Sequence, residues 1–172
     1  MTARLFSDRV IAISKAVREN LTDTGVPKEM ITVMMNGVEP LKELEDQDKK
    51  ELRQGYGIAD DEKAAGMIGR LEPVKGHEYF IKAIKQCNEN GLKIKGLIAG
   101  TGGIEEDLKQ LVSDLGIGDK IIFTGFLDEV APVVNILDVF VNASYGTEAS
   151  SLAMLEAMSL GKPVVATNYG GN

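Results

Sequence analysis

Cysteine, histidine and long apolar runs are nearly absent from this sequence. Cys87 is the single cysteine and His77 the single histidine among 172 residues. A single cysteine excludes an internal disulfide and a cysteine metal cluster, and it suits a reducing cytoplasm. No apolar run approaches the length of a membrane span, and the first residues lack the apolar core of an export signal. We therefore predict a cytoplasmic globular protein without a transmembrane segment.

Positive charge is also in short supply. The chain has 19 Lys and Arg against 26 Asp and Glu, so its formal net charge is −7. An acidic surface disfavours nucleic acid or an anionic membrane as the partner of the whole surface. Any bound phosphate must then be held by local groups. The length fits one α/β domain and is too short for two of ordinary size.

From residue 64 onward, apolar strand candidates alternate with helical segments. The strand candidates are 65–69, 95–99, 120–124, 138–142 and 163–167. The clearest helix, 104–115, carries its apolar residues on one face. This alternation predicts a doubly wound parallel sheet with helices on both faces. Ligands of such sheets bind beyond the carboxyl ends of the strands.

The first part of the chain has a smaller pattern of its own. A strand over 9–14, a helix through Leu21 and a strand over 31–34 form a β-α-β pattern. Charged residues then dominate 40–50, before a short helix that runs to Gly55. We interpret 36–45 as a hinge or linker.

Two glutamates, Glu148 and Glu156, are separated by seven residues after the fourth strand candidate. If the residues between them are mostly helical, the two backbones lie roughly 12 Å apart. An extended, polyhydroxylated phosphate ligand could contact both. An exposed Glu156 on the outer face of the helix is the alternative.

A helix is predicted to begin at Ser150-Ser151, after Glu148, and to end at Gly161. It shows Leu152, Leu155 and Met158 on one face, and Gly161 followed by proline marks its end. Its start at Ser150-Ser151 offers unpaired backbone N–H groups to an anion. A plain serine cap is the alternative, and both can hold at once.

A second candidate site is the loop Gly69–His77, with the sequence G-R-L-E-P-V-K-G-H, directly after the first strand of the regular part. Arg70 offers a planar fork and Lys75 a point charge, a combination suited to a diphosphate. Two surface cations on a loop are the alternative.

Three other motifs are weaker. Gly100-Thr101-Gly102-Gly103 joins a strand to a helix but completes no dinucleotide or Walker fingerprint. His77 has no nucleophile elbow to serve, so we place it in the first turn of a helix near the loop. Asp46-Gln47-Asp48 has the form of a metal-binding D-x-D motif, but it lies in a charged stretch, and we interpret it as a solvated helix start.

Together, these motifs resemble the retaining glycosyltransferases of the GT-B fold that use nucleotide-activated sugars, the glycosyl transferases group 1 family. Its C-terminal domain carries Glu, seven residues, Glu, and a G-R-L-x-x-x-K-G loop. The present chain keeps both, together with L-E-A-M-S-L-G-K-P-V-V-A. It departs from the family at Ala149–Leu152, where Gly-Phe-Gly is common. These positions shape the pocket around the sugar, so the departure affects the shape of that pocket.

The resemblance implies that a nucleotide-diphosphate sugar is the donor substrate and that neither a cofactor nor a metal is needed. It gives catalytic roles to Arg70, Lys75 and Glu148. Donor-binding roles fall to Gly69, Gly100, Gly102, Phe126, Ala149, Ser150, Ser151, Leu152 and Glu156. Gly100 and Gly102 serve mainly close packing, the backbone around Phe126 contacts the base, and Glu156 accepts hydrogen bonds from the ribose. Transfer is expected to retain the anomeric configuration.

The resemblance also implies a domain division. Residues 1–37 would be the tail of the N-terminal acceptor domain, 38–62 a hinge with a short helix, and 63–172 an incomplete nucleotide-sugar-binding domain. The acceptor, a glycan, lipid or small molecule, stays unidentified. The missing domain could contact the inner face of a membrane. Apolar residues between 10 and 34 would lack their usual neighbours, so we expect self-association.

Two other functions remain open. One is a nucleotide-sugar-binding module without transfer activity. The other is an enzyme of another class, such as a sugar-nucleotide epimerase on the same scaffold or an NAD-dependent Rossmann enzyme. The missing dinucleotide fingerprint argues against the NAD-dependent class.

Overall fold

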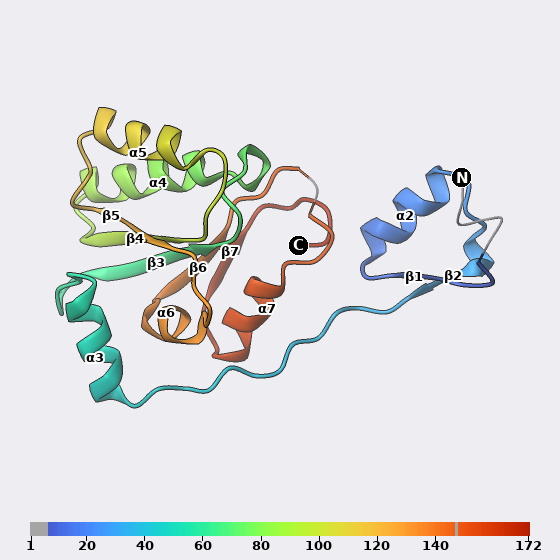
Figure 1. Ribbon diagram of the computed structural model, residues 1–172, viewed down its shortest axis with the longest axis horizontal. Coiled ribbons are helices and arrows are strands. Elements are labelled where there is room, and N and C mark those ends of the chain that lie inside the picture. The colour runs from blue at the N-terminus through green and yellow to red at the C-terminus, as the bar shows by residue number, and fades with distance from the viewer. Residues whose placement is uncertain (1–6, 147) are drawn as a thin grey trace.

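The computed structural model describes residues 7–146 and 148–172. It consists of a small β-α-β unit and a larger α/β lobe, joined by an extended segment (Figure 1). The small unit contains β1 (Val10–Ala12), α2 (Lys15–Asp23), the 3-10 turn η1 (Lys28–Met30) and β2 (Ile31–Val33). The lobe contains α3 (Asp46–Gly55), β3 (Lys63–Ile68), η2 (Pro73–Lys75), α4 (His77–Glu89), β4 (Ile94–Ala99), α5 (Glu105–Asp114), β5 (Ile121–Gly125), α6 (Ala131–Ile136), β6 (Val139–Asn142), α7 (Leu152–Ser159) and β7 (Val164–Ala166).

The lobe is built on a five-stranded parallel sheet in the order β5-β4-β3-β6-β7. Helices α4 and α5 cover one face, and α3, α6 and α7 cover the other (Figure 1). The predicted doubly wound parallel sheet is therefore confirmed. The strand order reverses between β4 and β6, on either side of β3, and such switch points are where these sheets bind ligands.

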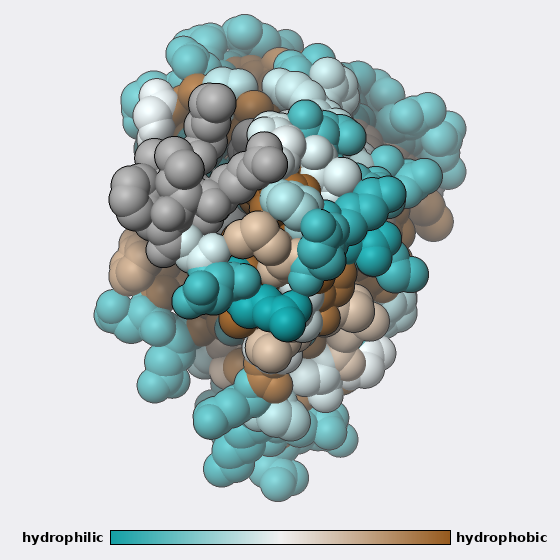
Figure 2. Space-filling view, turned by 90° about the vertical axis from the view of Figure 1, so that its right-hand side faces the viewer, coloured by the Kyte–Doolittle hydropathy of each residue, from teal (hydrophilic) through white to brown (hydrophobic). Residues whose placement is uncertain are grey.

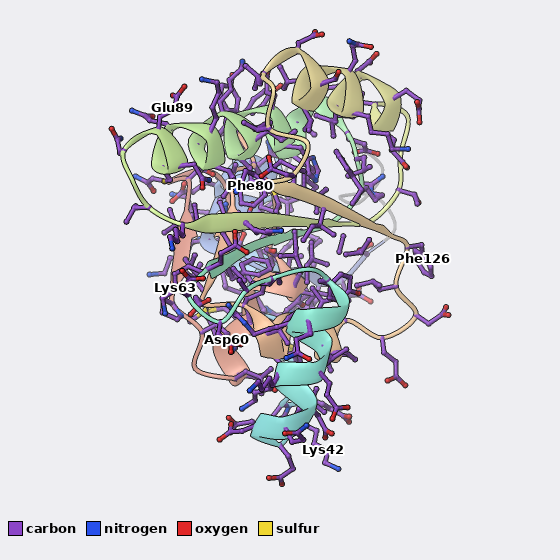
Figure 3. All side chains as sticks on the ribbon, turned by 90° about the vertical axis from the view of Figure 1, so that its left-hand side faces the viewer. Lys42, Asp60, Lys63, Phe80, Glu89 and Phe126 are labelled. Carbon is purple, nitrogen blue, oxygen red and sulfur yellow. The ribbon has the colours of Figure 1, made fainter. Side chains whose placement is uncertain are left out.

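Two apolar clusters fill the two faces of the sheet. Neighbouring residues of a strand point to opposite faces, so Ile98 packs with the α4 and α5 side chains while Leu97 packs with those of α6. Phe80, which is 2% exposed, points from α4 toward the sheet (Figure 3). The strands read as continuous apolar runs because both of their faces are covered.

Helix α7 packs differently from what its sequence suggests. The face predicted from Leu152, Leu155 and Met158 is not the one that meets the core, because Leu152 is 49% and Met158 55% exposed. Ala157 is fully buried instead, and Ala153 and Met154 pack against the same cluster. The helix has only two polar residues, Glu156 and Ser159, so its apolar periodicity alone could not choose between its sides.

The segment between the two units has no regular secondary structure over 34–45, a range that includes the predicted linker 36–45. Its last residues are nevertheless fixed to the lobe. The amide of Leu44 donates to Asn135 Oδ1 at 2.9 Å, and Asn135 Nδ2 donates to the Lys42 carbonyl at 3.0 Å. The amide of Leu41 donates to Ser159 Oγ at 3.0 Å. From Leu41 onward the segment is therefore bonded to the lobe, and its role as a hinge stays a prediction.

The small unit has only two paired strands, and apolar side chains lie on its surface. Ile11 and Met34 are each 58% exposed and Met35 is 77% exposed. Figure 2 shows brown apolar atoms among the teal ones on the face that includes this unit. The exposure fits the expected apolar patch, and self-association stays a prediction. No helix in 7–146 or 148–172 has the length and hydropathy that a membrane crossing requires.

Candidate functional site

The loops that follow β3, β4, β5 and β6 meet at the carboxyl end of the sheet. Phe126, just after β5, projects at this end, while Lys63 and Asp60 lie at the opposite end (Figure 3). The predicted site residues belong to these loops and to α7, so the topology gathers distant parts of the chain in one place.

A buried ion pair lies at the centre of this end. Lys75 Nζ donates to Glu148 Oε2 at 2.9 Å, and Ser144 Oγ donates to the same oxygen at 3.1 Å. The Glu148 side chain is only 7% exposed and that of Lys75 22%. A carboxylate this buried loses its hydration and requires a cation and hydrogen bonds in compensation, and here it has both.

We call the small space around this pair the polar cleft. It is lined by Met67, Ile68, Gly69, Lys75, Phe140, Val141, Asn142, Ser144, Glu148 and Ser151. Ser151 is also the N-cap of α7, where its hydroxyl accepts the Met154 amide at 3.3 Å. The serine cap is thus present at the start of a helix that faces the cleft. Anion binding at this helix start remains a prediction.

Next to the polar cleft is a larger space of about 390 Å³, which we call the apolar cavity. Its lining is Ile68, Gly69, Arg70, Ala99, Gly100, Thr101, Phe126, Leu127 and Val130. Ile68 and Gly69 belong to both spaces, so the two are adjacent. A ligand with an anionic part and a flat, less polar part could lie across them.

The glycines beside the apolar cavity allow two loops to pack backbone against backbone. Gly100 has φ +134°, and a Cβ there would lie 2.0 Å from the Gly69 carbonyl oxygen. A Cβ on Gly102 would lie 2.2 Å from the Leu71 carbonyl oxygen. This turn is therefore closely packed, since any side chain would push the loops apart, and its place beside a ligand stays a prediction.

Arg70 and Lys75 are not side by side. Arg70 lines the apolar cavity, is 74% exposed and pairs with Glu72 at 2.6 Å. Lys75 lines the polar cleft. Gly69 lines both spaces, so the two cations lie on either side of the boundary between them.

Several other predicted residues lie outside the linings of both spaces: Gly102, Ala149, Ser150, Leu152 and Glu156. Glu156 is half-buried on α7, and among the described residues no hydrogen bond reaches its carboxylate. The alternative of full exposure does not hold. Its predicted role as a ribose acceptor remains a proposal.

Sequence reasoning missed two polar residues of the cleft. Ser144 is 1% exposed and Asn142 5%, and the Ser144 amide donates to Asn142 Oδ1 at 3.1 Å. Asn142 is the last residue of β6. Polar residues at the carboxyl end of a strand predicted to be buried were the available signal.

His77 is the first residue of α4, as expected, and it is 1% exposed. Neither ring nitrogen has a hydrogen-bond partner in the part of the chain that the structure describes. Burial, with a smaller contribution from the charge of Lys75, lowers the pKa of His77 to about 4. The imidazole is therefore neutral at pH 7.

Asp46 and Asp48 lie in the first turn of α3, in agreement with a solvated helix start. The Asp46 side chain is fully exposed. Within 7–146 and 148–172, no three His, Cys, Asp or Glu side chains are grouped to hold a metal ion.

Comparison with known proteins gives concordant matches. The family described as "Glycosyl transferases group 1" matches residues 48–172. An uncharacterized glycosyltransferase of Methanocaldococcus jannaschii, MJ1607, is 34% identical over 96% of this chain and 43% of its own length. The alpha-monoglucosyldiacylglycerol synthase of Streptococcus pneumoniae is 34% identical over 92% of this chain and 37% of its own.

Among solved structures, Anabaena Alr3699/HepE in complex with UDP and glucose superposes with a TM-score of 0.90 at 29% identity. The match covers 98% of this chain and 46% of that one. The same protein has also been solved with UDP-glucose. The chain thus spans less than half the length of these relatives.

Proposed function

This chain belongs to the glycosyl transferases group 1 family, and from that premise we propose that it is the donor-binding part of a retaining glycosyltransferase. Its substrate would be a nucleotide-diphosphate sugar, and the sugar would pass to an acceptor with retention of the anomeric configuration. The similarity to a protein solved with UDP-glucose makes a UDP-sugar the first donor to test.

The observation that carries the proposal is the pairing of a polar cleft with an apolar cavity at the switch point of the sheet. The buried Lys75–Glu148 pair supplies a cation and a carboxylate, and the cavity beside it has room for a base. A nucleotide sugar consists of base, ribose, diphosphate and sugar in that order, so it too has a flat part next to an anionic one.

The leaving diphosphate gains negative charge as the bond to the sugar breaks. Arg70, Lys75 and the N-terminal backbone of α7 would stabilise that charge. Because Lys75 already pairs with Glu148 at 2.9 Å, a diphosphate would share or take over this cation. Glu148, held also by Ser144, would then orient the hydroxyl groups of the sugar.

The base would lie in the apolar cavity against the backbone of Gly100 and Phe126, and Glu156 would accept hydrogen bonds from the ribose. Gly69 and Gly102 would fix the loops, and Ala149, Ser150, Ser151 and Leu152 would form the turn that presents the start of α7. Glu156 lies outside both spaces. The ribose would therefore have to extend beyond them to contact Glu156, with a second domain covering it.

We place the domain division as the resemblance implies: 1–37 as the tail of an acceptor domain, 38–62 as hinge and short helix, and 63–172 as the donor-binding domain. The docked part of the linker supports a pivot before Leu41. The acceptor would be held largely by the part of the protein outside this chain.

The first experiment is calorimetric titration of this chain with UDP, GDP and ADP. We expect weak binding of at least one, and no binding of any of them at millimolar concentration would contradict the proposal. Arg70→Ala should weaken that binding by roughly 1.5–3 kcal/mol, the contribution of a charge-assisted hydrogen bond. Lys93→Ala is the matched control, because it removes one positive charge at the amino end of β4.

Metal independence is tested in the longer protein. If protein groups neutralise the leaving group, chelation by EDTA should leave sugar transfer essentially unchanged. Strict dependence on manganese would assign the charge compensation to a metal instead, and would direct attention back to Asp46 and Asp48.

A further inference from the structure

The turn that follows β7 packs backbone against backbone on the residues before α7. The amide of Gly171 donates to the Glu148 carbonyl at 2.9 Å. A Cβ on Gly170 would overlap the same carbonyl oxygen, and a Cβ on Gly171 would overlap that of Ala149. Such an approach is open only to residues without a side chain. The turn after β7 therefore supports the backbone that carries the Glu148 carboxylate.

Thr167, the first residue after β7, supports the same region through its side chain. Its hydroxyl donates to the Ser144 carbonyl, and the Ser144 amide donates to Asn142 Oδ1 at 3.1 Å. Both backbone polar groups of Ser144 are thus bonded. Its hydroxyl donates to Glu148 Oε2 at 3.1 Å. Because Ser144 is only 1% exposed and fixed on both sides, it links the end of β7 to the Glu148 carboxylate.

Asn172 connects the remaining groups of this network. Asn142 Nδ2 donates to Asn172 Oδ1 at 3.0 Å, and Asn172 Nδ2 donates to the Thr167 carbonyl at 3.4 Å. The amide of Thr167 also donates to the Asn142 carbonyl at 3.0 Å. Buried polar networks whose members satisfy one another make their surroundings rigid. Since Asn142 is 5% exposed, this network is a rigid support rather than a surface feature.

The network fixes one oxygen of Glu148 and leaves the other to a ligand. Among the described residues, the hydrogen bonds from Lys75 and Ser144 both reach Oε2, and none reaches Oε1. A carboxylate is planar, so fixing Oε2 restricts the position of Oε1 as well. Glu148 lines the polar cleft. Hydrogen bonds weaken steeply when their geometry is distorted, so the affinity for a hydroxyl group in the cleft should depend on this support.

We propose that Thr167 is a positioning residue that sets the affinity for the donor sugar. Its hydroxyl fixes Ser144, and Ser144 fixes the Glu148 carboxylate that contacts the sugar. Thr167 lines neither the polar cleft nor the apolar cavity, so it acts through these two residues and not by contact. The inference rests on the proposed function, because that function places the sugar at Glu148. Binding of the base and the diphosphate should not depend on Thr167.

The first test is Thr167→Val, which keeps the branched shape of the side chain and removes the hydroxyl. In calorimetric titration of the whole chain, the affinity for UDP-glucose should fall about fivefold, while the affinity for UDP should change by less than about twofold. Thr167→Ser keeps the hydroxyl and should stay within about twofold of the wild type for both compounds. Thr24→Val is the matched control, because the Thr24 hydroxyl also donates to a backbone carbonyl, but in the small unit.

A second measurement needs no ligand. Without the Thr167 hydroxyl, the segment around Ser144 should open more often, so the Ser144 amide should exchange with solvent about tenfold faster or more. NMR of the ¹⁵N-labelled chain measures this rate. Asn172→Leu, which removes the bond to Asn142, should also accelerate the exchange, and it serves as the test variant if Thr167→Val does not fold. An exchange rate that the folded variant leaves unchanged would overturn the proposal.

The nucleotide titrations separate this inference from the proposed function. Equal losses of affinity for UDP and UDP-glucose in Thr167→Val would show that Thr167 only supports the fold, and the inference would fail while the donor site stands. Unchanged affinity for both compounds would have the same consequence. If the wild type binds neither compound, the proposed function fails, and the role of Thr167 toward a sugar fails with it.

Discussion

The polar cleft and the apolar cavity are neighbours, yet they are built by different means. The cleft depends on side chains that fix one another: Lys75, Ser144 and Glu148 form one connected set at 2.9 and 3.1 Å. The cavity depends on backbone, because Gly69 and Gly100 bring two loops so close that a single Cβ would collide at 2.0 Å. Substitutions should therefore act through electrostatics and hydrogen bonding in the cleft and through steric overlap with the backbone in the cavity.

This difference matters for how each space tolerates change. In the cleft, removal of one partner leaves another buried and charged, so its energetics are coupled. In the cavity, side chains that project away from the loops should be replaceable, and Gly100 is the lining residue that should be strictly required. Four predictions follow from this contrast, in order of decreasing effect.

The largest effect is expected from Gly100→Ala. Its φ of +134° is strained for any L-residue, and the added Cβ would lie 2.0 Å from the Gly69 carbonyl oxygen. Backbone strain and overpacking each cost about 1–3 kcal/mol, so the free energy of unfolding should fall by about 4 kcal/mol. Urea denaturation measures it.

Gly103→Ala is the control for that change. No atom lies within 4 Å of the position a Cβ would take there, and no positive φ is required. Its stability should stay within about 0.5 kcal/mol of the wild type. If Gly100→Ala were as harmless as Gly103→Ala, the cavity would not be held by backbone contact, and the contrast drawn here would fail.

The second effect concerns the ion pair. Lys75→Met keeps the length of the side chain but leaves the Glu148 carboxylate, 7% exposed, without its cation. Breaking a buried pair on one side costs several kcal/mol, and because Lys75 is partly exposed we expect a loss of about 2–3 kcal/mol in the free energy of unfolding. UDP affinity should fall as well.

A double variant separates these two losses. In Lys75→Met with Glu148→Gln, neither side chain is charged, so most of the stability should return. The UDP affinity should not return, because the cation that meets the diphosphate is still missing. Recovery of both properties would mean that Lys75 serves only to neutralise Glu148, and its proposed catalytic role would be wrong.

The third effect depends on pH and concerns His77, the first residue of α4. Its ordinary pKa of 6.5 falls to about 4 in the folded chain, so the unfolded chain takes up a proton first as the pH falls. Stability should therefore decrease between pH 6.5 and 4, by at most about 3 kcal/mol from this group. His77→Phe should flatten that part of the curve relative to the wild type.

The comparison with the wild type is needed because other groups titrate nearby. Glu78 and Asp107 line a cavity together with His77, and Lys75 precedes this histidine by two positions, but all three residues are the same in the wild type and in His77→Phe. Their contribution cancels in the difference between the two curves. Identical curves for wild type and His77→Phe would show that the imidazole is not held neutral by burial.

Most of the fold could be predicted because its strands are marked unambiguously. All five strand candidates of the lobe became strands, since continuous apolar runs between helical segments have few other solutions. The orientation of α7 could not be predicted. Apart from Glu156 and Ser159 its residues are apolar, and packing against α6 and the sheet decides that Ala157 is buried while Met158 is exposed.

The site divides in the same way. Lys75 and Glu148 could be singled out because a charged residue in a predicted loop is visible in the sequence. That they pair with each other, 73 positions apart, depends on β3 and β6 being neighbours, which spacing does not encode. Ser144 was missed because a small residue carries no chemical signal until the fold brings it beside Glu148.

The smallest effect is expected from Phe126→Ala, and it is the sharpest test of a cavity made by backbone. Phe126 is the largest side chain at the mouth of the apolar cavity and is 72% exposed. Because so little of the ring is buried, the free energy of unfolding should change by less than about 0.5 kcal/mol. If the base meets the backbone there, UDP affinity should change by less than about twofold. Stacking of a base on an aromatic ring contributes roughly 1–3 kcal/mol. A loss of that size in calorimetry would show that the Phe126 ring binds the base. The apolar cavity, like the polar cleft, would then recognise its ligand through side chains.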